Sequence, residues 1–102
     1  MRRKTLEVLA PLLDVLRAHP SLRELRLAAF LLNGREFLHF HEEPEGLFAD
    51  VLLARGRVHM PVSSPAEQAA LLEQIDRVLE SLERRERSRR RRAPKRQLSR
   101  DR

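Results

Sequence analysis

The sequence predicts an α+β fold, a two-layer domain with an N-terminal helix, a small antiparallel β-sheet and a long C-terminal helix. Three observations predict it: leucines at helical spacing near the N-terminus, an Asn33-Gly34 dipeptide between two apolar segments, and a capping box that opens a long amphipathic stretch at Ser64. A chain of 102 residues can bury one modest core. We therefore expect one domain over 1–83, followed over 84–102 by an Arg-rich helix extension and a disordered basic tail.

The first helix is predicted by apolar residues that recur at three- and four-residue steps, namely Leu6, Leu9, Leu13 and Leu16. This spacing favours a helix over about 5–18. Pro11 lies inside the pattern, where proline removes a backbone donor and crowds the preceding turn. The regular helix therefore begins either near residue 5 or only at Pro11, a favoured first helical residue.

A β-hairpin is predicted around Asn33-Gly34, because this dipeptide favours a two-residue turn with positive φ angles. Leu22–Leu32 and Arg35–His41 should then pair as antiparallel strands. The acidic segment Glu42–Gly46 is interpreted as a loop.

The segment Leu47–Val62 has two interpretations. A short helix over Leu47–Arg55 would be framed by a proline before it and a glycine after it. Alternatively, Phe48–Leu53 and Arg57–Val62 form a second hairpin. We favour the hairpin, and the second arm is a strand in either case because its apolar residues alternate with polar ones.

The C-terminal helix is predicted to open with Ser64-Pro65-Ala66-Glu67, a capping box with proline at the first helical position. Its apolar stripe consists of Leu71, Leu72, Ile75, Val78, Leu79 and Leu82. The rising charge density and Pro94 predict that the helix ends near Ser88.

Charge is divided unevenly along the chain. Residues 1–83 carry 10 Lys/Arg and 13 Asp/Glu, whereas residues 84–102 carry 11 and 2, so the basic character belongs to the C-terminal extension.

The chain has no cysteine, which excludes disulfides, thiolate nucleophiles and Cys-ligated metal centres. No apolar run approaches the roughly 20 residues of a membrane span. A cytoplasmic protein is the expectation.

Two of the four histidines lie in the predicted strand Arg35–His41. Because side chains alternate along a strand, Phe37, His39 and His41 should share one face, and Glu36, Leu38 and Phe40 the other. Two parallel imidazoles can share a metal ion, a proton or an anion, or simply line a polar face.

The candidate ligand or metal site consists of His39, His41, Asp50 and His59, since imidazoles and a carboxylate are common ligands of zinc and related ions. The same histidines would act as general acid and base if paired with Glu36 or Asp50. A structural role is the third interpretation. Neither a Gly-rich phosphate loop nor a serine nucleophile motif is present. The cofactor and the catalytic residues stay unknown at this point, and enzymatic activity is an open question.

The basic extension suggests contact with nucleic acid or another polyanion through counterion release. The residues concerned are Arg89, Arg90, Arg91, Arg92, Lys95 and Arg96. The alternatives are a solvated, disordered tail or attraction to an anionic membrane surface. A homodimer is a further hypothesis, because the two helices offer more apolar surface than one small sheet covers.

Four segments together resemble a known family: Leu13–Leu22, Arg35–His41, Ala49-Asp50 and Pro61–Leu82. They resemble the small luciferase-like domain of bacterial and fungal proteins, which has no known function and is unrelated to the flavin-dependent barrel luciferases. The resemblance spans about residues 8–83 and implies a helix–sheet–helix α+β domain.

The positions that match the family pattern are Glu36, His39, His41 and Asp50. The chain is short between Asp50 and Val58, where relatives commonly carry an extra helix, and this departure favours the hairpin. Together with the missing nucleophile and phosphate-loop motifs, the resemblance favours a binding or accessory module of unknown activity over a stand-alone catalyst. A nucleic-acid binder and a metal-dependent enzyme are the alternatives.

Overall fold

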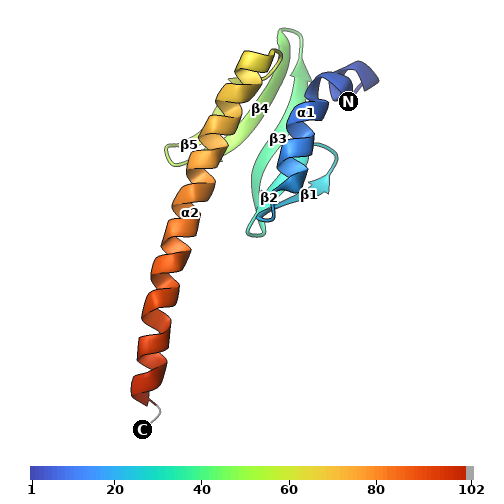
Figure 1. The fold of residues 1–102 in the computed structure, drawn as a ribbon. Helices are drawn as coiled ribbons and strands as arrows, with labels where there is room; N and C mark the ends of the chain where they lie inside the picture. The colour runs from blue at the N-terminus through green and yellow to red at the C-terminus, as the bar shows by residue number, and fades with distance from the viewer. Residues whose placement is uncertain (101–102) are drawn as a thin grey trace.

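The computed structural model describes the backbone of residues 1–100 and the side chains of residues 1–91. Its elements are α1 (Arg3–Ala18), β1 (Leu22–Arg26), β2 (Ala29–Leu32), β3 (Arg35–Glu43), β4 (Gly46–Leu53), β5 (Gly56–Pro61) and α2 (Pro65–Arg100). The predicted α+β class, with an N-terminal helix, an antiparallel sheet and a C-terminal helix, is confirmed (Figure 1).

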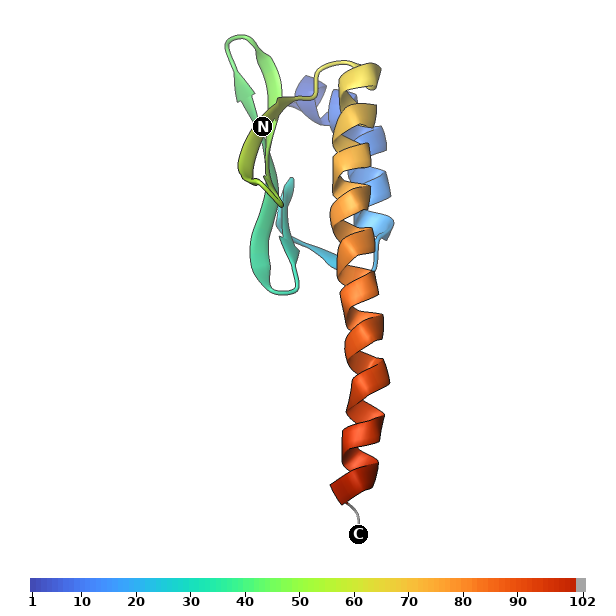
Figure 2. The same ribbon diagram turned by 90° about the vertical axis from the view of Figure 1, so that its left-hand side faces the viewer.

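The five strands form an antiparallel meander in the order β1-β2-β3-β4-β5. Both helices pack on the same face of this sheet, α1 against β1 and α2 against β4 and β5 (Figure 2). The core lies between the two layers, where Leu38, Phe40 and Val51 meet apolar side chains of both helices. The opposite face of the sheet is left open by the helices, and this face carries the site described below.

Helix α1 begins at Arg3 and runs through Pro11, so the helix start near residue 5 is the better of the two expectations. Its buried residues, at three- and four-residue steps, are Thr5, Leu9, Leu12, Leu13 and Leu16. Thr5 is the polar residue among them, and its Oγ1 donates a hydrogen bond to Glu42 Oε2 at 2.5 Å. This contact joins the start of the helix to the end of β3.

The predicted single strand Leu22–Leu32 is wrong, because a tight turn at Leu27-Ala28 divides it into β1 and β2. Ala28 adopts a φ of 61°, an unusual value for a residue with a side chain. Its N–H donates to Glu24 Oε2 at 2.8 Å, and its carbonyl accepts from Phe40 N at 3.0 Å. These two hydrogen bonds stabilise a turn that contains neither Gly nor Asn, the residues that usually indicate a turn in a sequence.

The hairpin between β2 and β3 is confirmed, with φ angles of 53° at Asn33 and 80° at Gly34. The second hairpin, β4–β5, is also confirmed, and no helix forms over Leu47–Arg55. The predicted acidic loop Glu42–Gly46 is wrong in its bounds, because the connection between the strands is only residues 44–45. Strand β3 continues to Glu43 and β4 starts at Gly46, because Glu42 and Glu43 pair in register with the following strand.

A β-bulge lies at Phe37. Phe30 pairs with Leu38 and Leu31 with Glu36, which leaves Phe37 as an extra residue in β3. Its side chain is only 2% exposed and belongs to the core. The expectation that Phe37 shares a face with His39 and His41 is therefore wrong, because the bulge interrupts the strict alternation.

Helix α2 opens with the predicted capping box. Glu67 N–H donates to Ser64 Oγ at 3.1 Å, and Glu67 Oε1 accepts from the backbone of Ser63 and Ser64. The helix does not end near Ser88 but continues to Arg100, with Pro94 inside it. Consequently the predicted disordered tail is largely helix, in keeping with the high helix propensity of Arg, Glu and Gln.

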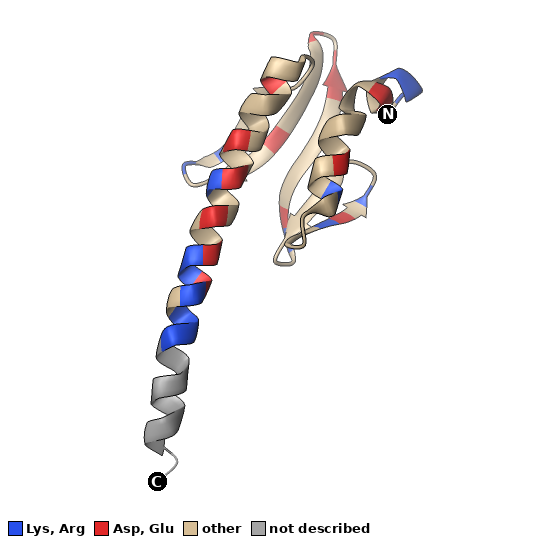
Figure 3. Cartoon of the chain, viewed as in Figure 1, with Lys and Arg blue, Asp and Glu red and all other residues tan. Residues whose placement is uncertain are grey.

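Beyond the sheet, the distal half of α2 extends away from the rest of the molecule (Figures 1 and 3). Within residues 1–100, no helix combines the length and the apolar composition that crossing a membrane requires.

Candidate metal centre on the open face of the sheet

Five polar side chains from three neighbouring strands gather on the open face of the sheet. His39, His41 and Glu43 lie on β3, Asp50 on β4 and His59 on β5. Alternation explains their common side, since sequence neighbours such as Phe40 and Val51 point the other way and are buried in the core. We call these five residues the histidine–carboxylate cluster.

Asp50 lies at the centre of the cluster because its strand is between the other two. It stands opposite His39 in the β3–β4 register and opposite His59 in the β4–β5 register. Its Oδ1 is 2.7 Å from His59 Nδ1, and its Oδ2 is 3.1 Å from His41 Nε2. His39 Nε2 approaches the same Oδ2 at 3.4 Å.

Glu43 faces the opposite nitrogens of two of these rings. Its Oε2 lies 3.3 Å from His41 Nδ1 and 3.3 Å from His59 Nε2. His41 and His59 therefore each bridge the two carboxylates, with one ring nitrogen toward Asp50 and the other toward Glu43. The four side chains form a closed polar ring.

The protonation of the rings follows from the chemistry of their partners. An ionised carboxylate only accepts hydrogen bonds, and each of these two rings faces one carboxylate with each nitrogen, so a neutral ring can donate to only one of them. When the shorter contacts to Asp50 take the protons, lone pairs remain on His41 Nδ1 and His59 Nε2, both facing the carboxylate of Glu43. Three electron-rich atoms then converge, and this arrangement needs a proton or a cation between them.

The electrostatics of the pair Asp50–His59 favour an ionised Asp50 and a protonated His59. Burial acts to raise the pKa of Asp50, but the hydrogen bond from His59 and the nearby imidazoles outweigh it and bring the pKa below its ordinary value. The hydrogen bond to Asp50 in turn raises the pKa of His59, against a smaller opposing effect of burial, and the charge of Glu43 adds to the increase. Asp50 is thus a carboxylate at neutral pH.

The cluster is open enough to exchange a ligand with solvent but is held in place by its neighbours. The side chains of His41, Asp50 and Glu43 are between 23% and 31% exposed, and that of His59 is 46% exposed. Phe48 stacks on the ring of His59, with centroids 4.5 Å apart and an interplanar angle of 8°. This stacking restricts rotation of the most exposed histidine.

Among the side chains of residues 1–91, two overlapping sets of three residues present ligand atoms within 4.8 Å of one another. The first set is His39, His41 and Asp50, and the second is His41, Glu43 and His59. All four residues predicted from the sequence, namely His39, His41, Asp50 and His59, are brought together. Their convergence on a sheet face matches the predicted geometry.

Glu43 was missed at the level of sequence, where it was assigned to a loop. The signal was present, because positions 39, 41 and 43 follow the two-residue period of a strand. Glu36, the alternative catalytic partner, is not part of the cluster. It lies three residues before His39 and pairs with Leu31 of β2.

The other predicted site residues lie on α2, away from the sheet cluster. Arg89, Arg90 and Arg91 are exposed. The side chains of Arg92, Lys95 and Arg96 lie outside those that the structure describes. The predicted nucleic-acid residues therefore form a separate feature.

No protein-family model, curated protein or solved structure matches this chain. The resemblance to the small luciferase-like domain stays a prediction, based on the four segments named above. The geometry of the cluster does not depend on that resemblance.

Proposed function

We propose that this chain is a metal-binding module that holds one divalent transition-metal ion on the open face of its sheet. The ligands are His41 Nδ1, Glu43 Oε2 and His59 Nε2. The observation that carries the proposal is the convergence of these two ring nitrogens and one carboxylate oxygen, each nitrogen 3.3 Å from the oxygen. A cation there removes the repulsion between three electron-rich atoms.

The spacing suits a tetrahedral ion. Atoms bound about 2.0–2.1 Å from a tetrahedral zinc ion lie about 3.3–3.4 Å from one another, by simple geometry. Two imidazoles and one carboxylate are ligands suited to zinc, cobalt, nickel and copper rather than magnesium or calcium. Three protein ligands leave one position open for water or for a bound molecule.

Asp50 has a positioning role in this proposal. By accepting N–H groups from His41 and His59, it fixes the ring tautomers that direct the remaining lone pairs toward Glu43. Carboxylates that accept a hydrogen bond from a metal-bound histidine are a regular feature of protein metal sites. The competing set, with His39 and Asp50 as ligands, requires the ring nitrogen of His41 that faces Asp50 to lose its proton.

The test is a titration of the metal-free protein with Zn²⁺ and Co²⁺ at neutral pH, followed by calorimetry and by the visible absorption of cobalt. We expect one ion per chain and the spectrum of a tetrahedral site. Glu43→Gln and His59→Gln should each weaken binding by at least about 10-fold, since each removes one of three ligands. His39→Gln is the matched control and should leave the affinity within about threefold.

The outcomes separate the two ligand sets. Loss of binding in His39→Gln together with full binding in Glu43→Gln assigns the ion to the competing set and refutes the proposed ligands. Absence of stoichiometric binding by the wild-type chain refutes the metal-binding function itself.

A second function is favoured by an independent observation on α2. Residues 84–91 include six arginines and one glutamate, all exposed, on a helix that extends beyond the sheet (Figure 3). A helix that presents guanidinium groups in all directions is suited to contact the phosphates of a nucleic-acid duplex. Such contact would supply affinity without sequence preference, because phosphates carry no base identity.

This second proposal is tested by the fluorescence anisotropy of a labelled DNA duplex at several salt concentrations. Replacement of Arg84, Arg87 and Arg91 by Gln should lower the affinity and reduce the slope of log K against log salt by about 0.9 for each phosphate that the variant no longer neutralises. Replacement of Arg23, Arg26 and Arg57 on the sheet is a control of equal charge. Equal weakening of binding in the two triple variants would contradict a specific role for α2.

A further inference from the structure

An open groove of about 530 Å³ lies where α2 leaves the sheet, next to the turns at Asn33 and Ala54. Its apolar wall includes Leu32, Phe37, Leu52, Leu53, Val78 and Leu82, of which Leu52 is the most exposed. Phe37 contributes because the β-bulge turns its side chain to the helix side of the sheet. Half-buried Val78 and Leu82 supply the α2 wall of the groove.

The charged residues of the groove are unevenly balanced. Arg35 of β3 and Arg85 and Arg89 of α2 line it, together with one carboxylate, Glu36. Among the side chains of residues 1–91, none of these four makes an ion pair within 4.0 Å. The groove thus combines an apolar wall with three guanidinium groups that are available to an anion.

We propose that this groove binds an anionic amphiphile, specifically a free long-chain carboxylate. The aliphatic chain lies along the apolar wall, and the carboxylate is held by Arg85 and Arg89, one helical turn apart on α2. Arginine pairs with carboxylates through two parallel hydrogen bonds, which fixes the head group as well as neutralising it. Burial of the chain adds affinity in proportion to the apolar surface covered.

The charge of the groove distinguishes this ligand from two other occupants. A second copy of the chain would bring its own arginines to α2, and like charges close together are unfavourable. A nucleic-acid backbone would satisfy the guanidinium groups but has no aliphatic chain for the apolar wall. A ligand with one anionic head and one apolar tail matches both parts of the groove.

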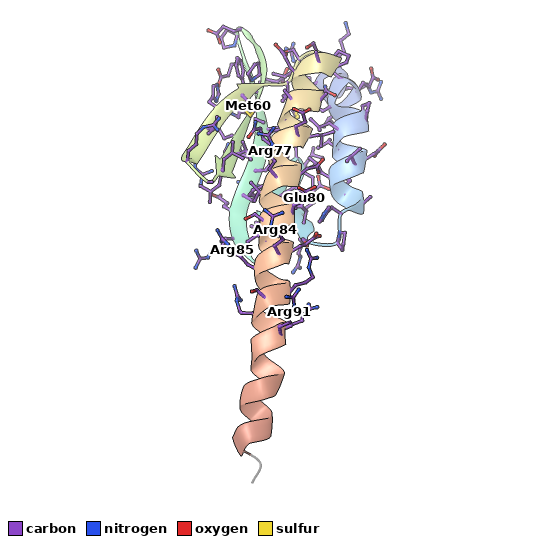
Figure 4. The ribbon with its side chains drawn as sticks, turned by 60° about the vertical axis from the view of Figure 1, so that its left-hand side comes forward. Met60, Arg77, Glu80, Arg84, Arg85 and Arg91 are labelled. Carbon is purple, nitrogen blue, oxygen red and sulfur yellow. The ribbon has the colours of Figure 1, made fainter. Side chains whose placement is uncertain are left out.

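The helix itself offers a matched control for the test. Arg85 and Arg89 line the groove, whereas Arg84 and Arg87 of the same helix do not. Arg84 and Arg85 lie on different sides of α2 (Figure 4). Two double variants with the same net charge, R85Q/R89Q and R84Q/R87Q, therefore separate the groove from the general charge of the helix.

The experiment is a calorimetric titration of the full chain with dodecanoate below its micellar concentration, in the presence of a chelator. The chelator keeps metal out of the histidine–carboxylate cluster, so a carboxylate has no metal ion to bind there. We expect one dodecanoate per chain, at least about 10-fold weaker binding of octanoate, and no binding of dodecyltrimethylammonium, which has the same tail and a cationic head. R85Q/R89Q should weaken dodecanoate binding at least about 10-fold, and R84Q/R87Q by less than about twofold.

Three results would overturn the proposal. One is equal weakening by the two double variants, which would indicate a diffuse effect of charge. Another is equal binding of dodecyltrimethylammonium, which would indicate apolar adsorption alone. The third is binding to anionic vesicles without any binding of monomeric dodecanoate, which would assign the arginines to a membrane surface.

Discussion

His59 Nδ1 lies 2.7 Å from Oδ1 of Asp50, the residue directly opposite it in the β4–β5 register. This is the shortest contact in the histidine–carboxylate cluster, and an ionised Asp50 accepts it from an N–H on His59 Nδ1. In the neutral ring the lone pair then lies on Nε2, the nitrogen that faces Glu43. A hydrogen bond between two strands thus prepares a ligand for a metal ion.

Asp50→Asn should weaken Zn²⁺ binding about 10–100-fold, the range typical when a residue that orients a metal-bound histidine is changed. An amide can present its N–H₂ group to the ring, so the required tautomer is no longer enforced. The measurement is calorimetric titration of the metal-free protein. The exposed Asp76→Asn on α2 is the control and should bind as the wild type does. Unchanged affinity in Asp50→Asn would contradict the positioning role.

The ion pair between Arg17 and Glu24 predicts a loss of stability in acid. The hydrogen bonds from Arg17, at 2.7 and 3.0 Å, lower the pKa of Glu24, burial opposes this, and the N–H of Ala28 lowers the pKa further. A carboxylate whose pKa is lower in the folded state stabilises the fold above its unfolded pKa, about 4.3, and loses this contribution as the pH falls through the folded value.

Glu24→Gln should therefore reduce the free energy of unfolding at pH 7 by at most about 1 kcal/mol, because Arg17 is partly exposed to solvent. The difference from the wild type should shrink as the pH falls from 5 to 3. Urea unfolding at each pH provides the measurement, with the exposed Glu80→Gln as control. A difference that stays constant down to pH 3 would show that ionisation of Glu24 is not its source.

Phe30→Ala should lower the free energy of unfolding by about 3–5 kcal/mol, the cost of removing a large buried aromatic side chain. Phe30 is 1% exposed, at the centre of the core. Phe48→Ala, on the open face, should cost clearly less, since Phe48 is only half-buried. Chemical denaturation measures both. If Phe30→Ala does not fold, Phe30→Leu should still fold with a smaller loss, and equal effects at the two sites would contradict the assigned core.

Ser64→Ala should destabilise the protein by about 1 kcal/mol, because it removes the side chain that caps the N-terminus of α2. Ser88→Ala, in the exposed part of the same helix, should have no destabilising effect, since alanine has the higher helix propensity. Thermal or denaturant unfolding checks both variants. An equal loss of stability in the two would indicate that the cap contributes nothing specific.

Local patterns in the sequence are sufficient for most of the secondary structure. The helical spacing of the leucines, the Asn33-Gly34 turn and the capping box at Ser64 each depend on residues a few positions apart, and all three predicted the observed elements. The missed turn at Ala28 is different in kind. It is stabilised by hydrogen bonds to the carboxylate of Glu24 and from the backbone of Phe40, and neither hydrogen bond can be recognised from the residue types near Ala28.

The sequence by itself determined that His39 and His41 share one face of a strand, because side-chain alternation is a property of extended backbone. Only the tertiary structure decided which residues join them. Asp50 and His59 lie beside the histidines because of the registers of two strand pairs. Glu43 joins them because β3 extends to residue 43, beyond the predicted end at His41. Phe37 lies on the other face because of a bulge. Register and bulges depend on pairing between distant segments, so no local pattern specifies them.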